Sequence, residues 1–388
     1  MNNNFFFPSN RSKIDAFAVM QMLSKANDIE KTGKTIYHLE LGEPQVSTPI
    51  EVKNKIKELL DYNLPGYTPS NGISDLRLKI SEYYKLKYKL NVNPDNIFVT
   101  TGSSGAFLLS FLSCFDARKR VGIFNPVYPA YRNILRSLDL DVIEIEPKKD
   151  NICKIDIKNI ESYKFLDGLI ISNPNNPNGQ VFSDKELEYI YIFCKSYNIT
   201  LISDEIYHGI EYDKKYSKSL LNFGSDSIII NSFSKYFCMP GWRLGWTIIP
   251  NYLKENFLKL SQNIFISSGS ISQYSAIKVF ECLESLDKIV SKYSVNRDLV
   301  SEKLSKFKRL KFFKPSGAFY YYLDVSDFHS DSSELVSRIL NETGVVLTPG
   351  TDFDKKNGHK TMRLAFSSKK NIIEKATEKL VDWFLKNY

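Results

Sequence analysis

The stretch SIIINSFSKYFCMPGWRLG, residues 227–245, holds the pattern on which the fold prediction depends. Its first five residues form a β-branched apolar run typical of a buried strand, and Ser232-Phe233-Ser234-Lys235 follows where that strand should end. A lysine among small hydroxyl residues, with Arg243 eight positions later, suits a Schiff base beside a phosphate better than it suits a core. A surface lysine is the structural alternative.

Further short apolar runs lie on both sides of this stretch, with helical patterns between them; they are residues 97–100, 121–124, 142–145, 168–172, 200–203 and 245–249. Strands that read as continuous apolar runs and alternate with helices are typical of a mostly parallel sheet covered by helices on both faces. The sequence therefore predicts an α/β fold with a seven-stranded, mostly parallel sheet.

The chain is long enough for two domains. We expect a large domain at residues 46–280 and a smaller α+β domain at residues 281–388. Residues 1–45 carry a helical pattern at 14–34 and an extended segment at 36–41, and we assign them to the small domain.

Composition excludes several classes of protein. The net charge is +8, but basic and acidic residues are interspersed without a basic block, which disfavours a nucleic-acid partner. The five cysteines are widely spaced without a Cys-x-x-Cys pair, so we expect no metal site and a reducing compartment. No apolar run resembles a signal peptide or reaches membrane-spanning length, which predicts a cytoplasmic protein without a membrane partner.

Polar residues follow several predicted strands, and ligands of open α/β sheets bind at such strand ends. After residues 97–100, Gly102, Ser103 and Ser104 begin a helix whose free backbone amides suit a phosphate. An ordinary helix start has the same residue types and is the alternative. After residues 121–124, Tyr128 stands between two prolines, where it presents a flat face to an aromatic ligand or packs as part of a rigid loop.

Three more residues suggest a ligand. Asn176, in a loop rich in Asn and Pro, offers an amide donor, or is part of a plain loop. Asp204 ends a buried strand and needs a cationic or hydrogen-bonding partner; a protonated ring nitrogen would serve, and the alternative is a cap on the next helix. Arg363, inside an apolar strand at 362–366, needs an anion, either a substrate carboxylate or a structural Asp or Glu.

Taken together and in this order, these segments resemble the class I/II aminotransferases of the aspartate aminotransferase fold. The resemblance covers nearly the whole chain, and its motifs are Gly42-Glu43-Pro44, Asn176-Pro177-Asn178-Gly179, Ser232-Phe233-Ser234-Lys235, Gly241-Trp242-Arg243-Leu244-Gly245 and Arg363. It implies an enzyme that uses pyridoxal 5'-phosphate (PLP) to move an amino group between an L-amino acid and a 2-oxo acid by a ping-pong mechanism. Two positions depart from the usual pattern: Asn178 replaces a threonine, and Ser104 stands where some aspartate-specific relatives have a lysine.

The resemblance also implies roles for individual residues. Lys235 would hold PLP as a Schiff base and move the proton, Asp204 would pair with the ring nitrogen, and Tyr207 would donate to the ring oxygen together with Asn176. Arg363 would bind the substrate carboxylate, and the backbone of Gly42 and the side chain of Asn176 would assist it. Further cofactor-binding residues would be Tyr128 stacked on the ring and, near the phosphate, Gly102, Ser103, Ser104, Ser232, Ser234 and Arg243. Tyr67 would reach the phosphate of the neighbouring subunit, which implies a homodimer.

Other readings remain open at this stage. The same fold carries β-lyases, decarboxylases and oxidases that use PLP. A PLP-binding regulatory protein is less favoured because the chain has no room for a DNA-binding module, and a nicotinamide enzyme lacks its Gly-x-Gly-x-x-Gly motif. The sequence does not determine the amino donor or the acceptor; Phe17, Tyr320 and residues 264–270 are candidate liners of the side-chain pocket.

Overall fold

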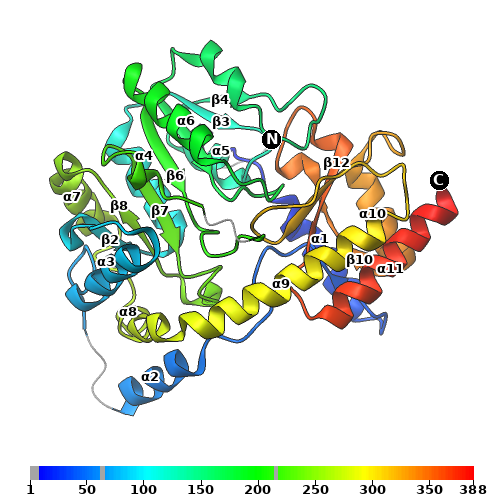
Figure 1. The fold of residues 1–388 in the computed structure, drawn as a ribbon, viewed down its shortest axis with the longest axis horizontal. Helices are drawn as coiled ribbons and strands as arrows, with labels where there is room; N and C mark the ends of the chain where they lie inside the picture. Colours follow the sequence, from blue (N-terminus) through cyan, green and yellow to red (C-terminus); the bar gives the residue numbers. More distant parts are fainter. Residues whose placement is uncertain (1–7, 62–65, 214–216) are drawn as a thin grey trace, which may run out of the picture.

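The structure is a computed structural model that describes residues 8–61, 66–213 and 217–388 (Figure 1). The helices are α1 Ala18–Glu30, α2 Ile50–Asp61, α3 Ser74–Tyr88, α4 Gly102–Cys114, α5 Pro129–Ser137, α6 Asp184–Ser196, α7 Lys254–Ile264, α8 Ser270–Ala276, α9 Leu283–Leu304, α10 Ser332–Thr343 and α11 Lys370–Asn387. The strands are β1 Tyr37–His38, β2 Ile97–Thr100, β3 Arg120–Phe124, β4 Asp141–Ile145, β5 Gly168–Ser172, β6 Thr200–Asp204, β7 Ile228–Ser232, β8 Gly245–Ile248, β9 Tyr320–Asp324, β10 Val345–Val346, β11 Thr348–Pro349 and β12 Thr361–Ala365.

The central sheet has seven strands in the order β2-β8-β7-β6-β5-β3-β4. The pairs from β7 to β4 are all parallel, and β8 runs antiparallel to both of its neighbours. The predicted fold class, a seven-stranded and mostly parallel sheet, is confirmed. Each of the seven apolar runs became a strand because β-branched side chains fit a pleated sheet, and the strands between the two edges are buried on both faces.

Helices cover both faces of this sheet (Figure 1). Successive strand residues point to opposite faces: Ile170 packs with residues of α4, α5 and α7, whereas Ile171 packs with residues of α3 and α6. A sheet buried between two helical layers leaves its strand ends as the place where polar groups can meet a ligand.

The rest of the fold is built on two small sheets. Strands β11, β12 and β9 form an antiparallel sheet, and β1 pairs in parallel with β10, so that Tyr37 lies opposite Val345. The long helix α9 runs from the large sheet toward α11, which packs against it (Figure 1). The N-terminal strand thus joins the C-terminal part of the chain, and the grouping of residues 1–45 with residues 281–388 stays a prediction.

The first helix is shorter than predicted. The apolar pattern suggested residues 14–34, but α1 spans Ala18–Glu30. Its start is set by a contact remote in sequence, because the carboxylate of Asp352 accepts hydrogen bonds from the backbone N–H groups of Ala18 and Val19. Gly33, with φ of +90°, lies three residues past the end of the helix.

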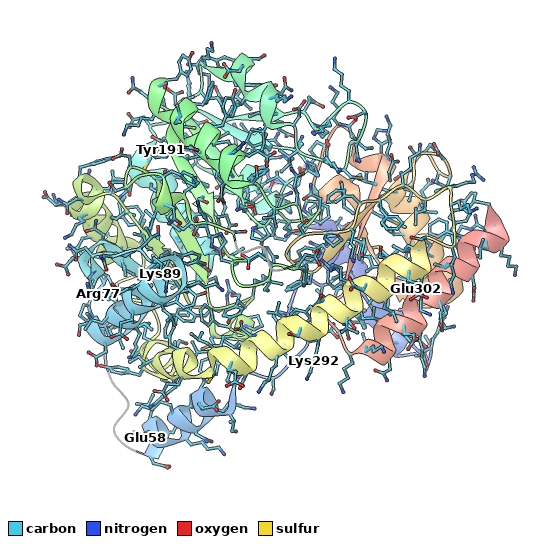
Figure 2. The ribbon with its side chains drawn as sticks, viewed as in Figure 1. Glu58, Arg77, Lys89, Tyr191, Lys292 and Glu302 are labelled. Atoms are coloured by element: carbon cyan, nitrogen blue, oxygen red, sulfur yellow. The ribbon has the colours of Figure 1, made fainter. Side chains whose placement is uncertain are left out.

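The surface carries charges of both signs. Figure 2 labels Lys292 and Glu302 along the outward side of α9, and both are exposed. No helix in the described part of the chain is long and apolar enough to cross a membrane. All five cysteines are free thiols, and four of them are buried.

Candidate active site

One cavity of about 460 Å³ lies at the carboxyl ends of the central strands. Ser172 ends β5, Asp204 ends β6, and Ser234 follows β7. The cavity brings together most of the residues predicted from the sequence: Gly42, Ser103, Ser104, Tyr128, Asn176, Asp204, Tyr207, Ser234, Lys235, Arg243 and Arg363. Phe17 and Tyr320, two of the candidate pocket liners, also border it.

Lys235 is held in this cavity by the tight turn after β7. Its ammonium group donates a hydrogen bond to the carbonyl of Gly42 and lies 5.9 Å from the centre of the Tyr207 ring. Burial, followed by the nearby positive charge of Arg363, lowers the pKa of Lys235 to about 8. An amine with such a pKa is partly neutral near pH 7.5, as a nucleophile and proton carrier must be.

Asp204 is a buried carboxylate with two hydrogen-bond donors. The hydroxyl of Tyr131 donates to Oδ2, and the backbone N–H of Ile206 donates to Oδ1 at 3.0 Å. Burial raises the pKa of Asp204 to about 6, so a cationic partner would be needed to hold it fully ionised. The alternative reading of Asp204 as a helix cap is wrong, because residues 206–209 form a turn rather than a helix.

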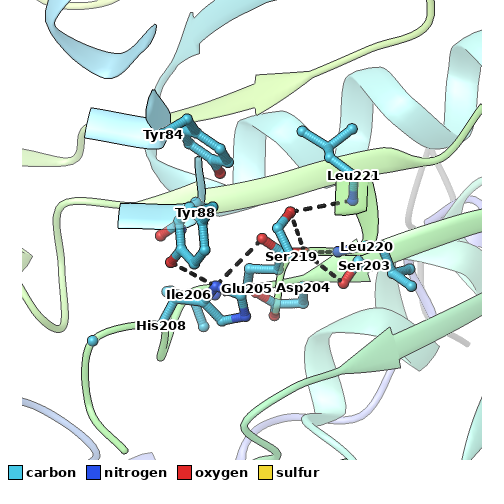
Figure 3. Close-up of polar contacts among 12 residues, drawn as sticks. Tyr84, Tyr88, Ser203, Asp204, Glu205, Ile206, His208, Ser219, Leu220 and Leu221 are labelled. Carbon is cyan, nitrogen blue, oxygen red and sulfur yellow. Dashed lines mark hydrogen bonds and ion pairs between the residues drawn. The ribbon is translucent and has the colours of Figure 1, made fainter. Parts of the chain in front are cut away.

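A second buried acid lies next to Asp204 but outside the cavity. Figure 3 shows Glu205 among Ser203, Ser219 and Leu220. The hydroxyls of the two serines and the backbone N–H of Leu220 donate to Glu205 Oε1 at 2.9–3.3 Å. Its Oε2 lies 3.5 Å from His208 Nδ1, which also lies 2.8 Å from the Tyr88 hydroxyl. Burial raises the pKa of Glu205 to about 8 and lowers the pKa of His208 to about 3. Both groups are neutral near pH 7, so Asp204 is the more acidic of the two neighbouring carboxyls.

Two tyrosines and an asparagine line the side of the cavity near Arg363. The hydroxyls of Tyr207 and Tyr320 lie 2.6 Å apart, and burial raises the pKa of Tyr207 well above its usual value. Asn176 accepts a hydrogen bond from Arg363 through its side-chain oxygen, at 2.9 Å. Because the amide oxygen is taken, Asn176 presents its NH2 group as a donor.

The start of α4 and Arg243 form a second polar corner of the cavity. Gly102 has φ of +72°, and a Cβ added there would lie 2.7 Å from Arg243 Nη2, so the backbone and the guanidinium approach closely only because residue 102 is glycine. Thr101 occupies the N-cap position, and Ser103 and Ser104 lie in the first helical turn. Ser232 is buried behind this corner, with its hydroxyl bonded to Leu244 O and to the Ser234 hydroxyl. Free helix amides beside an arginine form an anion site of the kind that phosphates occupy.

Arg363 is a buried cation whose hydrogen-bond acceptors are all neutral. It is 4% exposed, and it donates to Asn176 Oδ1, to Glu40 O at 2.6 Å and, more weakly, to Thr348 Oγ1 at 3.4 Å. Within the described ranges no carboxylate forms an ion pair with it, and its Nε has no hydrogen-bond partner. A structural Asp or Glu, the alternative considered from the sequence, is therefore not what holds Arg363. A buried guanidinium without an anion is open to a carboxylate supplied from outside.

Four predicted site elements do not line this cavity: Gly102 and Ser232, which adjoin residues that do, and Tyr67 and residues 264–270. Tyr67 is 85% exposed and does not line it, and neither does any residue of 264–270. Among the lining residues that were not identified from the sequence are Tyr131 and Asp352. Tyr131 follows Tyr128 by three positions at the start of α5, so the helical spacing could have indicated it. Asp352 is placed by tertiary packing and gives no such local signal.

The model of the family described as "Aminotransferase class I and II" matches residues 34–380. The chain belongs to this family. The aminotransferase is 35% identical over 384 residues to the valine–pyruvate aminotransferase of Mycobacterium tuberculosis, an alignment that covers 96% of this chain and 97% of that protein. It is also 35% identical over 379 residues to the (5-formylfuran-3-yl)methyl phosphate transaminase of Methanocaldococcus jannaschii, covering 96% and 98% of the two chains.

Solved structures agree with this assignment. The crystal structure of an aminotransferase from Mycobacterium tuberculosis superimposes with a TM-score of 0.95 at 34% identity, covering 98% of this aminotransferase and 100% of that chain. The predicted resemblance to class I/II aminotransferases is confirmed, and with it the assignment of the chain as an aminotransferase.

Enzymes of this family use PLP, and the cavity of this aminotransferase fits that cofactor. Lys235 is an amine of lowered pKa, Asp204 is a buried carboxyl without a cation, and the corner at Gly102 and Arg243 suits a phosphate. No group of His, Cys, Asp and Glu side chains within residues 8–61, 66–213 and 217–388 could hold a metal ion.

Proposed function

We propose that this aminotransferase holds PLP covalently on Lys235 and moves an amino group between an L-amino acid and a 2-oxo acid in two half-reactions. The observation that carries the proposal is the meeting, in one cavity, of Lys235, the buried carboxyl of Asp204 and the unpaired guanidinium of Arg363. Lys235 suits the aldehyde of PLP, Asp204 its ring nitrogen, and Arg363 the carboxylate of the substrate.

PLP supplies an aldehyde for the amino group and an electron-accepting ring, and the chain supplies position and protons. Arg363 binds the α-carboxylate of the substrate, which brings the α-carbon toward Lys235. Lys235 Nζ, freed once the substrate amine replaces it on PLP, would accept the proton from that carbon and donate it back for the transfer of the amino group. Asp204 would face the ring nitrogen and favour its protonated form, and Tyr207 and Asn176 would donate to the ring oxygen. The phosphate would be held by Gly102, Ser103, Ser104, Ser232, Ser234 and Arg243, and Tyr128 would lie against the ring.

The cofactor assignment and the donor class are tested together by spectroscopy. The purified protein should bind PLP with visible absorbance, and single L-amino acids should convert it to the absorbance of the amine form of the cofactor. A 2-oxo acid should then restore the first spectrum without release of ammonia. Release of pyruvate and ammonia, or consumption of oxygen, in the absence of a 2-oxo acid would instead identify a lyase or an oxidase.

Replacing Arg363 by Lys should lower kcat/KM for any amino donor about 100-fold. The lysine keeps one positive charge but loses the planar pair of donors, and such buried charge-assisted contacts are worth about 2–3 kcal/mol. The affinity for PLP should change less than about threefold, because Arg363 faces the substrate rather than the cofactor. Steady-state kinetics and a cofactor titration measure both quantities.

The matched control for this variant is Arg297→Lys. Arg297 is equally buried, but it pairs with Asp213 at 2.9 Å and does not border the cavity. Its substitution should lower the melting temperature and leave kcat/KM unchanged. Equal losses of kcat/KM in the two variants would show that Arg363 is a structural residue.

We further propose a homodimer in which Tyr67 contributes to the neighbouring active site. Tyr67 is exposed on its own subunit, and its loop is anchored by hydrogen bonds from Gln273 to Thr68 and from Ser270 to Gly66. The exposed apolar side chains of Ile264 and Ile266 also suit an interface.

Five free thiols support a reducing compartment such as the cytoplasm.

A further inference from the structure

Apolar side chains make up part of the cavity lining. We define the apolar wall as the side chains of Phe17, Val19, Met20, Leu41 and Phe353, all of which line the cavity. At one end, the ring of Phe17 lies 6.2 Å from the ring of Tyr128, and at the other end Phe353 lies 4.7 Å from the Arg363 guanidinium carbon. With the α-carboxylate of a donor on Arg363, the wall is the surface available to its side chain.

The charges of the described lining residues do not fit a donor that carries a second carboxylate. The lining cations are Lys235, Arg243 and Arg363, and each already has a role with the imine, the phosphate or the α-carboxylate. The remaining charged liners are the acids Glu43, Asp204 and Asp352. A side-chain carboxylate would meet apolar carbon and negative charge, so its loss of hydration would go uncompensated.

The part of the wall that lies on α1 is held by one carboxylate that is remote from α1 in sequence. Asp352 is 4% exposed and accepts from Ala18 N–H at 2.7 Å and from Val19 N–H at 3.1 Å. Because Ala18 is the first residue of α1, Asp352 acts as the cap of that helix in place of a local side chain. Asp352 also precedes Phe353, so one short segment supplies one end of the wall and holds the other.

We propose that this cavity selects amino donors with uncharged, apolar side chains. The apolar wall contacts these side chains, and Asp352 positions the wall. This inference rests on the proposed function, because it assigns the donor to the same site. Both oxygens of Asp352 accept from the backbone of α1, so this carboxylate is committed to holding the helix. Asp352 is thus a positioning residue, and the contacts with the donor come from the wall.

The donor class is tested by measuring kcat/KM for leucine, methionine, phenylalanine, aspartate, glutamate and lysine with the holoenzyme. The best apolar donor should exceed aspartate at least about 100-fold, the scale on which an unpaired polar group is rejected by an apolar site. A preference for aspartate, glutamate or lysine would overturn the inference and leave the proposed function standing. A failure of every donor would overturn the proposed function itself.

The role of Asp352 is tested with Asp352→Ala against the matched variant Asp331→Ala. Asp331 caps α10 by accepting from Ser333 N–H at 2.7 Å, and it does not line the cavity. Asp352→Ala should raise KM for leucine about tenfold and change kcat less than about threefold, since a loosened wall weakens binding rather than the chemical step. KM for alanine should change less than about twofold, because a methyl group makes little contact with the wall.

The control variant should lose a similar amount of thermal stability and keep both KM values. If Asp352→Ala and Asp331→Ala have the same KM for leucine, or if KM rises equally for leucine and alanine, Asp352 is only a structural cap. Asp352→Asn keeps one acceptor for α1, so it should fold even where the alanine variant does not. It should show a smaller rise of KM for leucine, and an unchanged KM would likewise refute the positioning role.

Discussion

Replacing Lys235 by Ala should lower kcat by at least about 10⁴-fold, the upper end of what a positioned proton-transfer group contributes. The variant loses both the covalent attachment of PLP and the amine that moves the proton, while its neighbours Asp204 and Arg363 stay in place. The protein should also lose the visible absorbance of the bound cofactor. Both are measured on purified protein at saturating PLP, with turnover of the best donor followed by coupled assay.

Two further lysine variants separate the amine from its charge and from any general effect of substitution. Lys235→Arg keeps a cation that can donate to the Gly42 carbonyl, but a guanidinium stays protonated and forms no imine, so it should be as inactive as the alanine variant. Lys303→Ala removes a buried lysine paired with Glu378 at 2.6 Å, away from the cavity, and should keep full turnover. Normal turnover by Lys235→Ala would refute the assignment of the active site.

The sequence predicted the central sheet well because its signal is local. Each strand is a short run of β-branched residues, and the polar residues that end the strands at Ser172, Asp204 and Ser232 are read directly from the chain. Since parallel strands end at the same edge, the sequence also indicated that Asp204, Asn176 and Lys235 would lie together. The cavity contains all three.

What the sequence did not predict depends on contacts between distant segments. The start of α1 is set by Asp352, 334 residues from Ala18, and no periodicity within residues 14–34 carries that information. The neutral surroundings of Arg363 likewise come from three separate segments, at Glu40, Asn176 and Thr348. Only the tertiary structure decides between a structural ion pair and a site that is open to a ligand.

Replacing Asp204 by Asn should lower kcat/KM about 1,000-fold and at the same time stabilise the cofactor-free protein. The loss of activity follows because a neutral amide does not hold a proton on the ring nitrogen, and removing one member of a buried charge pair costs about 3–5 kcal/mol. The gain in stability follows from the pKa of Asp204, which burial raises from 3.8 to about 6 in the folded state. Steady-state kinetics and denaturant unfolding at several pH values measure the two effects.

The sign of the stability effect depends on pH. Between pH 3.8 and about 6 the folded state binds more protons than the unfolded state, so the free energy of unfolding falls as the pH rises through this window. Above pH 6 the whole penalty of an ionised buried carboxylate remains, and Asp204→Asn should remove up to about 3 kcal/mol of it. Below pH 3.8 Asp204 is protonated in both states, and the variant should gain nothing.

Glu205→Gln is the matched control, because Glu205 is the adjacent buried carboxyl and lies outside the cavity. It should keep kcat/KM within about threefold, and because burial also raises its pKa, it should likewise gain stability at high pH. If Asp204→Asn retained normal activity, or if Glu205→Gln lost as much, the acid that faces the ring nitrogen would have to be sought elsewhere. A buried carboxylate without a cation lowers the stability of the folded protein until that cation binds. A residue whose replacement stabilises the fold but abolishes turnover therefore serves the ligand rather than the fold.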